Sequence, residues 1–231
     1  RPAALGPHLI RLRPAEHARA RIDNYALWVQ PEAGRDVRWM RDPAGNHLAR
    51  LTFRDAERVE ALEVLVELAV EVQPINPFDF FLEEDAKQLP VTYDVGARRA
   101  LAAFLECDDP AYAGGPRFEA FMEAVPTRGE TVDFLVALAQ LAAKEVNYVI
   151  REAAGVWTPE ETLGHGRGSC RDTTALLVAA LRRRGLAARF ASGYLVQLTD
   201  EGMIPDQPRG VGRDVVDLHA WAEVYLPGAG W

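Results

Sequence analysis

One cysteine and one histidine in the second half of the chain have the surroundings that nucleophilic catalysis needs. Cys170 lies in the run Gly-Ser-Cys-Arg-Asp at 168–172, where a helix is predicted to begin, and His219 lies within a predicted strand. Backbone amides at a helix start favour a thiolate over a thiol, and a nearby imidazole can serve as its base. The two residues are far apart in sequence, so this chemistry requires a fold that brings them together.

Capping residues on both sides of Cys170 support the predicted helix start. Ser169 and Asp172 have the spacing of a capping box, with Ser169 as the N-cap, so Cys170 takes the first helical position. The same unpaired amides could hold an oxyanion formed on a substrate carbonyl. Apolar residues continue at helical spacing to Gly185, which predicts a buried helix that holds the thiol rigidly.

The role of His219 has alternatives on spacing alone. A strand over 215–225 places five side chains on one face: Asp217, His219, Trp221, Glu223 and Tyr225. His219 could therefore be the base for Cys170, or a half-buried side chain packed beside Trp221. His165 is a second possible base, although its glycine-rich loop at 164–168 favours a mobile surface role. That loop lacks the Gly-Lys-Ser/Thr of a phosphate-binding loop.

The part of the chain before this site begins with a strand-like region. Residues 1–90 are strand-like, most clearly over 59–72, where apolar residues alternate with glutamates. This pattern predicts an antiparallel β-sandwich-like domain without a catalytic constellation of its own. The aromatic run at 78–81 follows, and we expect it to pack at a seam between domains, with a docking site as the alternative.

A second domain is predicted over 91–231. Helices are expected over 95–105, 118–125 and 131–150, and from Ser169 to Gly185; strands are expected over 188–197 and 215–225, joined by a polar loop at 198–214. The whole chain is therefore predicted to be an α+β protein. Its nucleophile lies at the N-terminus of a helix that packs on an antiparallel sheet.

Composition and charge limit the partners, cofactors and location that we expect for this chain. The net charge of −8, from 26 basic and 34 acidic residues, argues against a nucleic-acid or anionic-membrane surface. Cys107 and Cys170 do not form a disulfide framework, and no cysteine or histidine motif calls for a metal or another cofactor. No apolar run reaches the roughly 18–20 residues of a membrane span. No signal-peptide pattern opens the chain, so cytoplasmic residence is expected.

Three motifs in order carry a family resemblance. Gly-Ser-Cys-Arg-Asp is followed by Arg-Gly-Leu-Ala-Ala-Arg-Phe-Ala-Ser-Gly-Tyr-Leu and then by Asp-Leu-His-Ala-Trp-Ala-Glu-Val-Tyr-Leu-Pro-Gly-Ala-Gly-Trp. Over about residues 130–231 the chain resembles the bacterial transglutaminase-like cysteine peptidase family, and its first ninety residues resemble the β-rich N-terminal region that accompanies this core. The resemblance implies a papain-like or transglutaminase-like core, with Cys170 as nucleophile and His219 as general base.

The chain departs from the family pattern at its end. The family's third catalytic residue is an Asp in Gly-Trp-x-x-x-Asp-Pro, which falls beyond Trp231. Asp217 is an imperfect stand-in, because it lies about 6.6 Å along the strand from His219 and points alongside the ring. The chain reads as a piece of a longer protein with further domains. If it is complete, weak or no activity is expected; if it is truncated, the parent protein has the full triad.

The expected function is therefore thiol-dependent acyl transfer, in which peptide or amide bonds of a peptide or protein substrate are cleaved through a thioester. One alternative is transglutaminase-type transfer to an amine. Another is a catalytically inactive module that binds a peptide or protein. Specificity is expected from the 198–214 loop and the domain seam.

Overall fold

The computed structural model describes residues 2–18, 20–32, 34–53, 58–71, 76, 78–199 and 211–231. The chain divides into two units, Arg1–Asn76 and Pro77–Trp231. The sequence placed this boundary later, after residue 90. The difference arises because Leu82 and Leu89 pack with the core of the second unit, and Leu89 pairs with Gly129 in a short antiparallel ladder. Each unit is described by itself.

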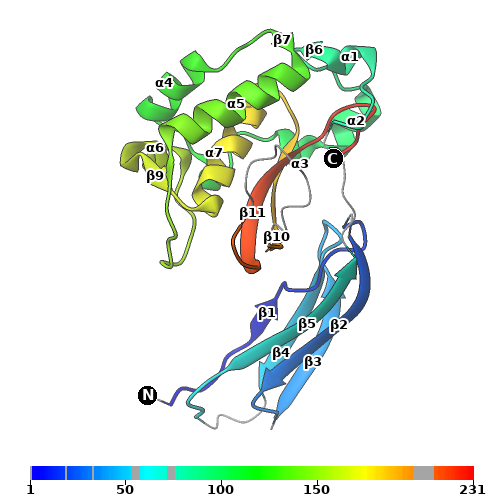
Figure 1. The fold of residues 1–231 in the computed structure, drawn as a ribbon, viewed down its shortest axis with the longest axis vertical. Helices are drawn as coiled ribbons and strands as arrows, with labels where there is room; N and C mark the ends of the chain where they lie inside the picture. Colours follow the sequence, from blue (N-terminus) through cyan, green and yellow to red (C-terminus); the bar gives the residue numbers. More distant parts are fainter. Residues whose placement is uncertain are drawn as a thin grey trace. The chain divides into compact units, whose positions relative to one another are not determined.

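The first unit contains two antiparallel sheets (Figure 1). Their strands are β1 (His8–Ile10), β4 (His47–Phe53) and β3 (Arg35–Arg41) in one sheet, and β2 (Arg21–Gln30) and β5 (Glu63–Glu71) in the other. The alternation predicted around β5 is confirmed. Its three glutamates are exposed, and every second residue, from Val64 to Val70, is half-buried. An edge-to-face contact with ring centroids 5.9 Å apart joins Tyr25 to Trp39. The sandwich arrangement of the two sheets stays a prediction.

The second unit mixes helices with short and long strands. Its helices are α1 (Glu84–Lys87), α2 (Val95–Ala100), α3 (Ala102–Leu105), the 3-10 turn η1 (Pro110–Tyr112), α4 (Pro116–Ala124), α5 (Thr131–Glu145), α6 (Pro159–His165) and α7 (Cys170–Arg183). Its strands are β6 (Gln88–Leu89), β7 (Gly129–Glu130), β8 (Asn147–Tyr148), β9 (Arg167–Gly168), β10 (Ala188–Gln197) and β11 (Val215–Val224). Among the residues described, no helix has the length and apolar character needed to cross a membrane.

Helix α7 is central to this unit. It packs against α5 and α6 and against both long strands, β10 and β11. Its inward side chains Leu176, Val178 and Ala180 are fully buried and belong to the main hydrophobic core. Burial of this apolar face, rather than helix propensity, therefore holds the start of α7 in place. The helix ends as predicted near Gly185, whose φ of 77° is a left-handed conformation that glycine adopts without strain.

Two helix predictions need correction. The helix expected over 131–150 ends at Glu145, and the following residues form β8, which pairs in parallel with β9. Asn147 N–H donates to Gly166 O at 3.0 Å and Val149 N–H donates to Gly168 O at 2.9 Å. These tertiary hydrogen bonds overrode the helical periodicity. The helix expected over 95–105 is divided at Leu101 into α2 and α3.

Tyr93 connects the segment before α2 to the start of β10 and the end of β11. Its hydroxyl accepts from Ala187 N–H at 2.9 Å and donates to Tyr225 O at 3.0 Å. Burial raises the pKa of the Tyr93 hydroxyl, although the Ala187 amide opposes that shift. The hydroxyl thus satisfies two backbone groups that would otherwise be left without a partner in the protein interior.

Replacing Tyr93 by phenylalanine is expected to lower the free energy of unfolding by about 1–3 kcal/mol, because a buried N–H loses its acceptor. Urea denaturation of the two proteins measures the difference. Tyr148→Phe is the matched control, since the Tyr148 side chain is exposed and should change stability little. A Tyr93→Phe protein as stable as the control would contradict the role of the hydroxyl.

Candidate active site

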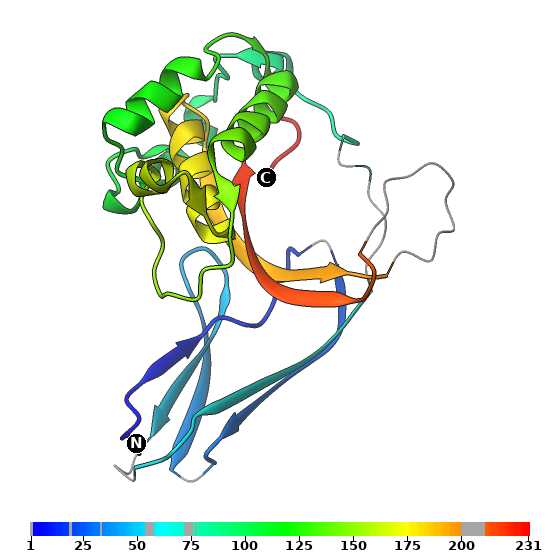
Figure 2. The ribbon, with the colours of Figure 1, turned by 60° about the vertical axis from the view of Figure 1, so that its left-hand side comes forward.

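Helix α7 and strand β10 bring the Cys170 end of the helix to the level of His219. Residues 184–187 connect the two elements, which pack together, so α7 runs antiparallel to β10. A helix of this length spans about 20 Å, which equals about six residues of strand. Counted from Ala188, this reaches Tyr194, whose partner on β11 is Leu218, the neighbour of His219. Figure 2 shows β10 and β11 side by side as a long, curved ribbon.

The pleat of β11 separates His219 from the strongly packed face of the strand. Ala222 and Val224 pack against the core that contains α7, whereas His219 alternates with them and shares its face with Trp221. Within the described residues, no hydrogen bond involves the Cys170 thiol or the His219 ring. Asp217 is exposed, and its Oδ1 accepts from the backbone N–H of the next residue, Leu218, at 2.7 Å.

The indole of Trp221 lies over the residue opposite His219. Gly193 pairs with His219 across the ladder, and a Cβ atom at Gly193 would come within 2.8 Å of the Trp221 ring. The indole N–H donates to Glu223 Oε1 at 3.1 Å, and the other carboxylate oxygen of Glu223 accepts from Arg189 Nε at 2.7 Å. Glycine at 193 is thus required by the close approach of this anchored indole.

The predicted cap around Cys170 is confirmed. Helix α7 begins at Cys170, with Ser169 as its N-cap and a capping box closed by Asp172. Ser169 donates to Asp172 Oδ2 through both its backbone N–H and its hydroxyl, each at 2.8 Å. The nucleophile candidate therefore lies between two residues that are bonded to each other. This bond fixes the first turn of the helix, where the backbone amides lack partners within the helix.

Asp172 also binds a chain segment that sequence reasoning did not connect with it. Arg151 donates to both carboxylate oxygens, at 3.0 Å from Nε and 2.7 Å from Nη2, and Trp157 N–H donates to Oδ1 at 2.8 Å. The Asp172 side chain is fully buried and that of Arg151 is 10% exposed. Burial alone would raise the pKa of Asp172, but the Arg151 guanidinium and the Trp157 and Ser169 donors hold it far below its usual range.

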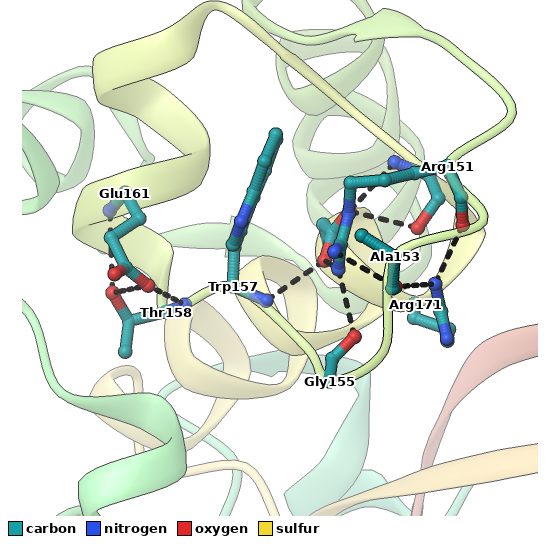
Figure 3. A network of polar contacts seen from close by, with 9 residues as sticks. Arg151, Ala153, Gly155, Trp157, Thr158, Glu161 and Arg171 are labelled. Carbon is teal, nitrogen blue, oxygen red and sulfur yellow. Dashed lines mark hydrogen bonds and ion pairs between the residues drawn. The ribbon is translucent and has the colours of Figure 1, made fainter.

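Residues 149–157, which we call the 149–157 loop, are held by further contacts drawn in Figure 3. The Arg151 guanidinium donates to Ala153 O at 3.1 Å and to Gly155 O at 2.8 Å, and it lies 4.4 Å from the centre of the Trp157 ring. From the other side, Arg171 Nη2 donates to Arg151 O at 2.8 Å and to Ala153 O at 3.1 Å. The side chains of the two residues that follow Cys170, Arg171 and Asp172, thus bind this loop.

His165 takes a defined place in this arrangement. It is the last residue of α6 and not part of a glycine loop, and its ring contacts that of Trp157, with centroids 4.4 Å apart and the rings tilted by 38°. Gly166 follows with φ of 60°, a left-handed helix end. At the other end of α6, the capping box predicted from Thr158 to Glu161 is confirmed.

Arg151 and Trp157 were not among the predicted site residues. The predicted helix ran to Ile150 and so placed Arg151 just past a helix end, where the sequence indicated no acidic partner for its guanidinium. A signal was available in the run Val-Asn-Tyr-Val-Ile at 146–150, whose β-branched residues favour a strand. A buried Asp in the first turn of a core helix also requires a cationic partner, and Arg151 is that partner.

No group of three or more His, Cys, Asp or Glu side chains among the described residues could hold a metal ion. Both Cys107, which is exposed, and Cys170, which is half-buried, are free thiols.

Two family models match the chain. The model of the Transglutaminase-like superfamily matches residues 121–231, and the model of the Bacterial transglutaminase-like N-terminal region matches residues 1–71. The first match includes Cys170 and His219.

The chain is also similar to curated relatives and to solved structures. Uncharacterized proteins of Mycobacterium tuberculosis and Mycobacterium bovis are 28% identical over 218 residues, which is 94% of this chain. The chain spans only 66% of the length of these relatives. A crystal structure from Cytophaga hutchinsonii, of a protein thought to be a cysteine protease, aligns with a TM-score of 0.65 at 15% identity, covering 98% of this chain and 70% of that one. The periplasmic domain of TgpA from Pseudomonas aeruginosa aligns at 0.44, with 19% identity and coverage of 89% and 62%.

Proposed function

Because residues 121–231 belong to the transglutaminase-like superfamily and residues 1–71 to its bacterial N-terminal region, we propose that this chain carries a thiol-dependent acyl-transfer site. Cys170 is the nucleophile and His219 the general base. The substrate is a peptide or protein, and the reaction is hydrolysis of a peptide or amide bond. No metal or cofactor takes part in this scheme.

The reaction proceeds in two halves. His219 takes the proton from the Cys170 thiol, and the thiolate attacks the amide carbonyl carbon to form a C–S bond. Amides in the first turn of α7 stabilise the oxyanion. The C–N bond then breaks as His219 returns the proton to the leaving amine, which leaves a thioester. Water, deprotonated by His219, attacks the thioester, releases the carboxylic acid and restores the thiol.

The observation that carries this proposal is the place of Cys170, at the start of a buried helix whose first turn is fixed by Asp172. Hydrolysis is favoured over transfer to an amine, because a thioester must be shielded from water for an amine to compete. The acid that orients His219 is proposed to follow Trp231 in the longer protein. Asp217 is not assigned that role, because along the strand it lies about 6.6 Å from His219 and points alongside the ring.

A catalytically inactive peptide-binding module is the second candidate. It is favoured by two observations. The described residues provide no hydrogen bond between the Cys170 and His219 side chains, and His219 lies on the face of β11 opposite to Ala222 and Val224, which pack on the core that contains α7. Under this alternative the chain holds a peptide near Cys170 and His219, but the thiol forms no covalent intermediate.

Trapping of the acyl-enzyme separates the two candidates. When a peptide thioester is added as acyl donor, we expect the acyl group on Cys170, seen as a mass increase of the peptide that contains it. The adduct should be absent in Cys170→Ala. Adding a primary amine should divert little of the product from acid to amide; major diversion would favour the transglutaminase-type reaction. The absence of an adduct, both here and in a form that extends beyond Trp231, would favour the binding module.

A further inference from the structure

The register of β8 and β9 aligns Ile150 with Cys170. Strand β8 pairs in parallel with β9, so Asn147 is opposite Arg167 and Tyr148 is opposite Gly168. The pairing continues for one more hydrogen bond, from Val149 N–H to Gly168 O. The next residue of one segment is Ile150, and the other segment continues through Ser169 to Cys170. Since neighbouring strands lie about 4.8 Å apart, this places the backbone of Ile150 next to the start of α7.

The backbone around Ile150 is fixed on both sides. Val149 is held by Gly168, and Arg151 is held by the buried Asp172 carboxylate and by the Arg171 side chain. The side chain of Ile150 is nevertheless 83% exposed, and that of Val156, in the same loop, is 46% exposed. Two aliphatic side chains are therefore held in solvent on a rigid segment, which is unfavourable unless something covers them.

The charges near these side chains balance one another. Arg151 is paired with the Asp172 carboxylate, whereas Arg171, in the described part of the chain, is bonded only to loop carbonyls. Glu152, the residue after Arg151, is exposed and opposite in charge to Arg171. Neither sign of charge on a substrate is therefore favoured here, and the exposed aliphatic side chains of Ile150 and Val156 are the feature that a substrate can recognise.

We propose that Ile150 and Val156 form the apolar wall of the acyl-donor subsite, and that the substrate carries an apolar side chain next to the carbonyl carbon attacked by Cys170. This inference rests on the proposed function and names its substrate class. The occupant is the substrate, because the strand register aligns Ile150 with the nucleophile. The wall is built by the same contacts that fix the first turn of α7.

Peptidyl chloromethyl ketones test this wall directly. Each alkylates a cysteine next to the side chain under test, so probes with leucine, lysine or aspartate at that position report its preference. We expect the leucine probe to modify Cys170 of the full chain at least about tenfold faster than the aspartate probe. Ile150→Ser should bring the rates close together, Ile150→Leu should keep the preference, and Val156→Ser should weaken it. Modification is followed by mass spectrometry.

Iodoacetamide and one control variant make the outcome decisive. Iodoacetamide carries no side chain, so its rate at Cys170 should be the same in the original protein and in Ile150→Ser. Val95→Ser removes an equally exposed aliphatic side chain at the start of α2 and should change no rate. If Cys170 reacts normally with iodoacetamide but reacts equally fast with all three ketone probes, or prefers the lysine or aspartate probe, the apolar subsite is contradicted and the proposed function is not. A Cys170 inert to iodoacetamide would overturn both.

Discussion

Replacing Asp172 by asparagine is expected to lower the free energy of unfolding by about 3–5 kcal/mol, because it leaves the Arg151 guanidinium poorly compensated in the interior. The carboxylate is fully buried and accepts from Arg151, Trp157 and Ser169. An asparagine fills nearly the same space but carries no charge, and its amide nitrogen cannot accept. Urea denaturation followed by tryptophan fluorescence and circular dichroism measures the loss.

An exposed ion pair provides the matched control for this change. Arg183 Nη2 donates to both carboxylate oxygens of Glu119 at 2.7 and 2.9 Å, and both side chains are about half exposed. Glu119→Gln is expected to cost less than about 1 kcal/mol, because exposed pairs contribute little. Equal effects of Asp172→Asn and Glu119→Gln would contradict a structural role for the buried pair.

The contribution of Asp172 to stability should depend on pH in a defined direction. Its pKa in the folded protein is lowered, so its contribution is complete above the unfolded value of about 3.9 and is lost as the pH falls toward the folded value. The difference in stability between the original protein and Asp172→Asn is therefore expected to be constant near neutral pH and to shrink below about pH 4. A difference that grows on acidification would contradict this assignment.

Replacing His219 by alanine is expected to slow acyl transfer by about 10²–10⁴-fold, the usual contribution of a general base. The loss arises in two steps, because His219 activates Cys170 and later activates water. Hydrolysis of a peptide thioester measures it, in this chain and in a form that extends beyond Trp231. Cys170→Ala gives the background rate.

His165→Ala separates the two histidines considered as bases. The His165 ring packs against Trp157 at the end of α6, so removing it should change the rate only slightly. A large loss in His165→Ala together with a normal rate in His219→Ala would transfer the base role to His165.

Local features of the site could be predicted from the sequence because they depend on neighbouring residues. The capping boxes at Ser169 and at Thr158 follow from spacing of three residues, and both are present. The alternation along β5 likewise follows from a period of two. Such signals specify where an element begins and which face it buries, without any knowledge of the rest of the fold.

Contacts between distant segments could not be predicted in the same way. Val146 and Val149 fitted the helical repeat of α5, but their segment leaves the helix to pair with the residues before Cys170. The ion pair of Arg151 with Asp172 depends on that pairing. Because the predicted helix extended a few residues too far, neither this ion pair nor the exposure of Ile150 could be predicted. Most of the predicted 198–214 loop, residues 200–210, lies outside the described residues.

The most direct test of the central claim compares the two cysteines of the chain under iodoacetamide at neutral pH. Cys107 is exposed and Cys170 is half-buried, so exposure alone predicts faster modification of Cys107. If Cys170 is a nucleophile activated by His219, it should react faster than Cys107, and this advantage should disappear in His219→Ala while the rate of Cys107 stays constant. Slow and equal modification of both cysteines, unchanged by the His219 substitution, would contradict the proposed pairing.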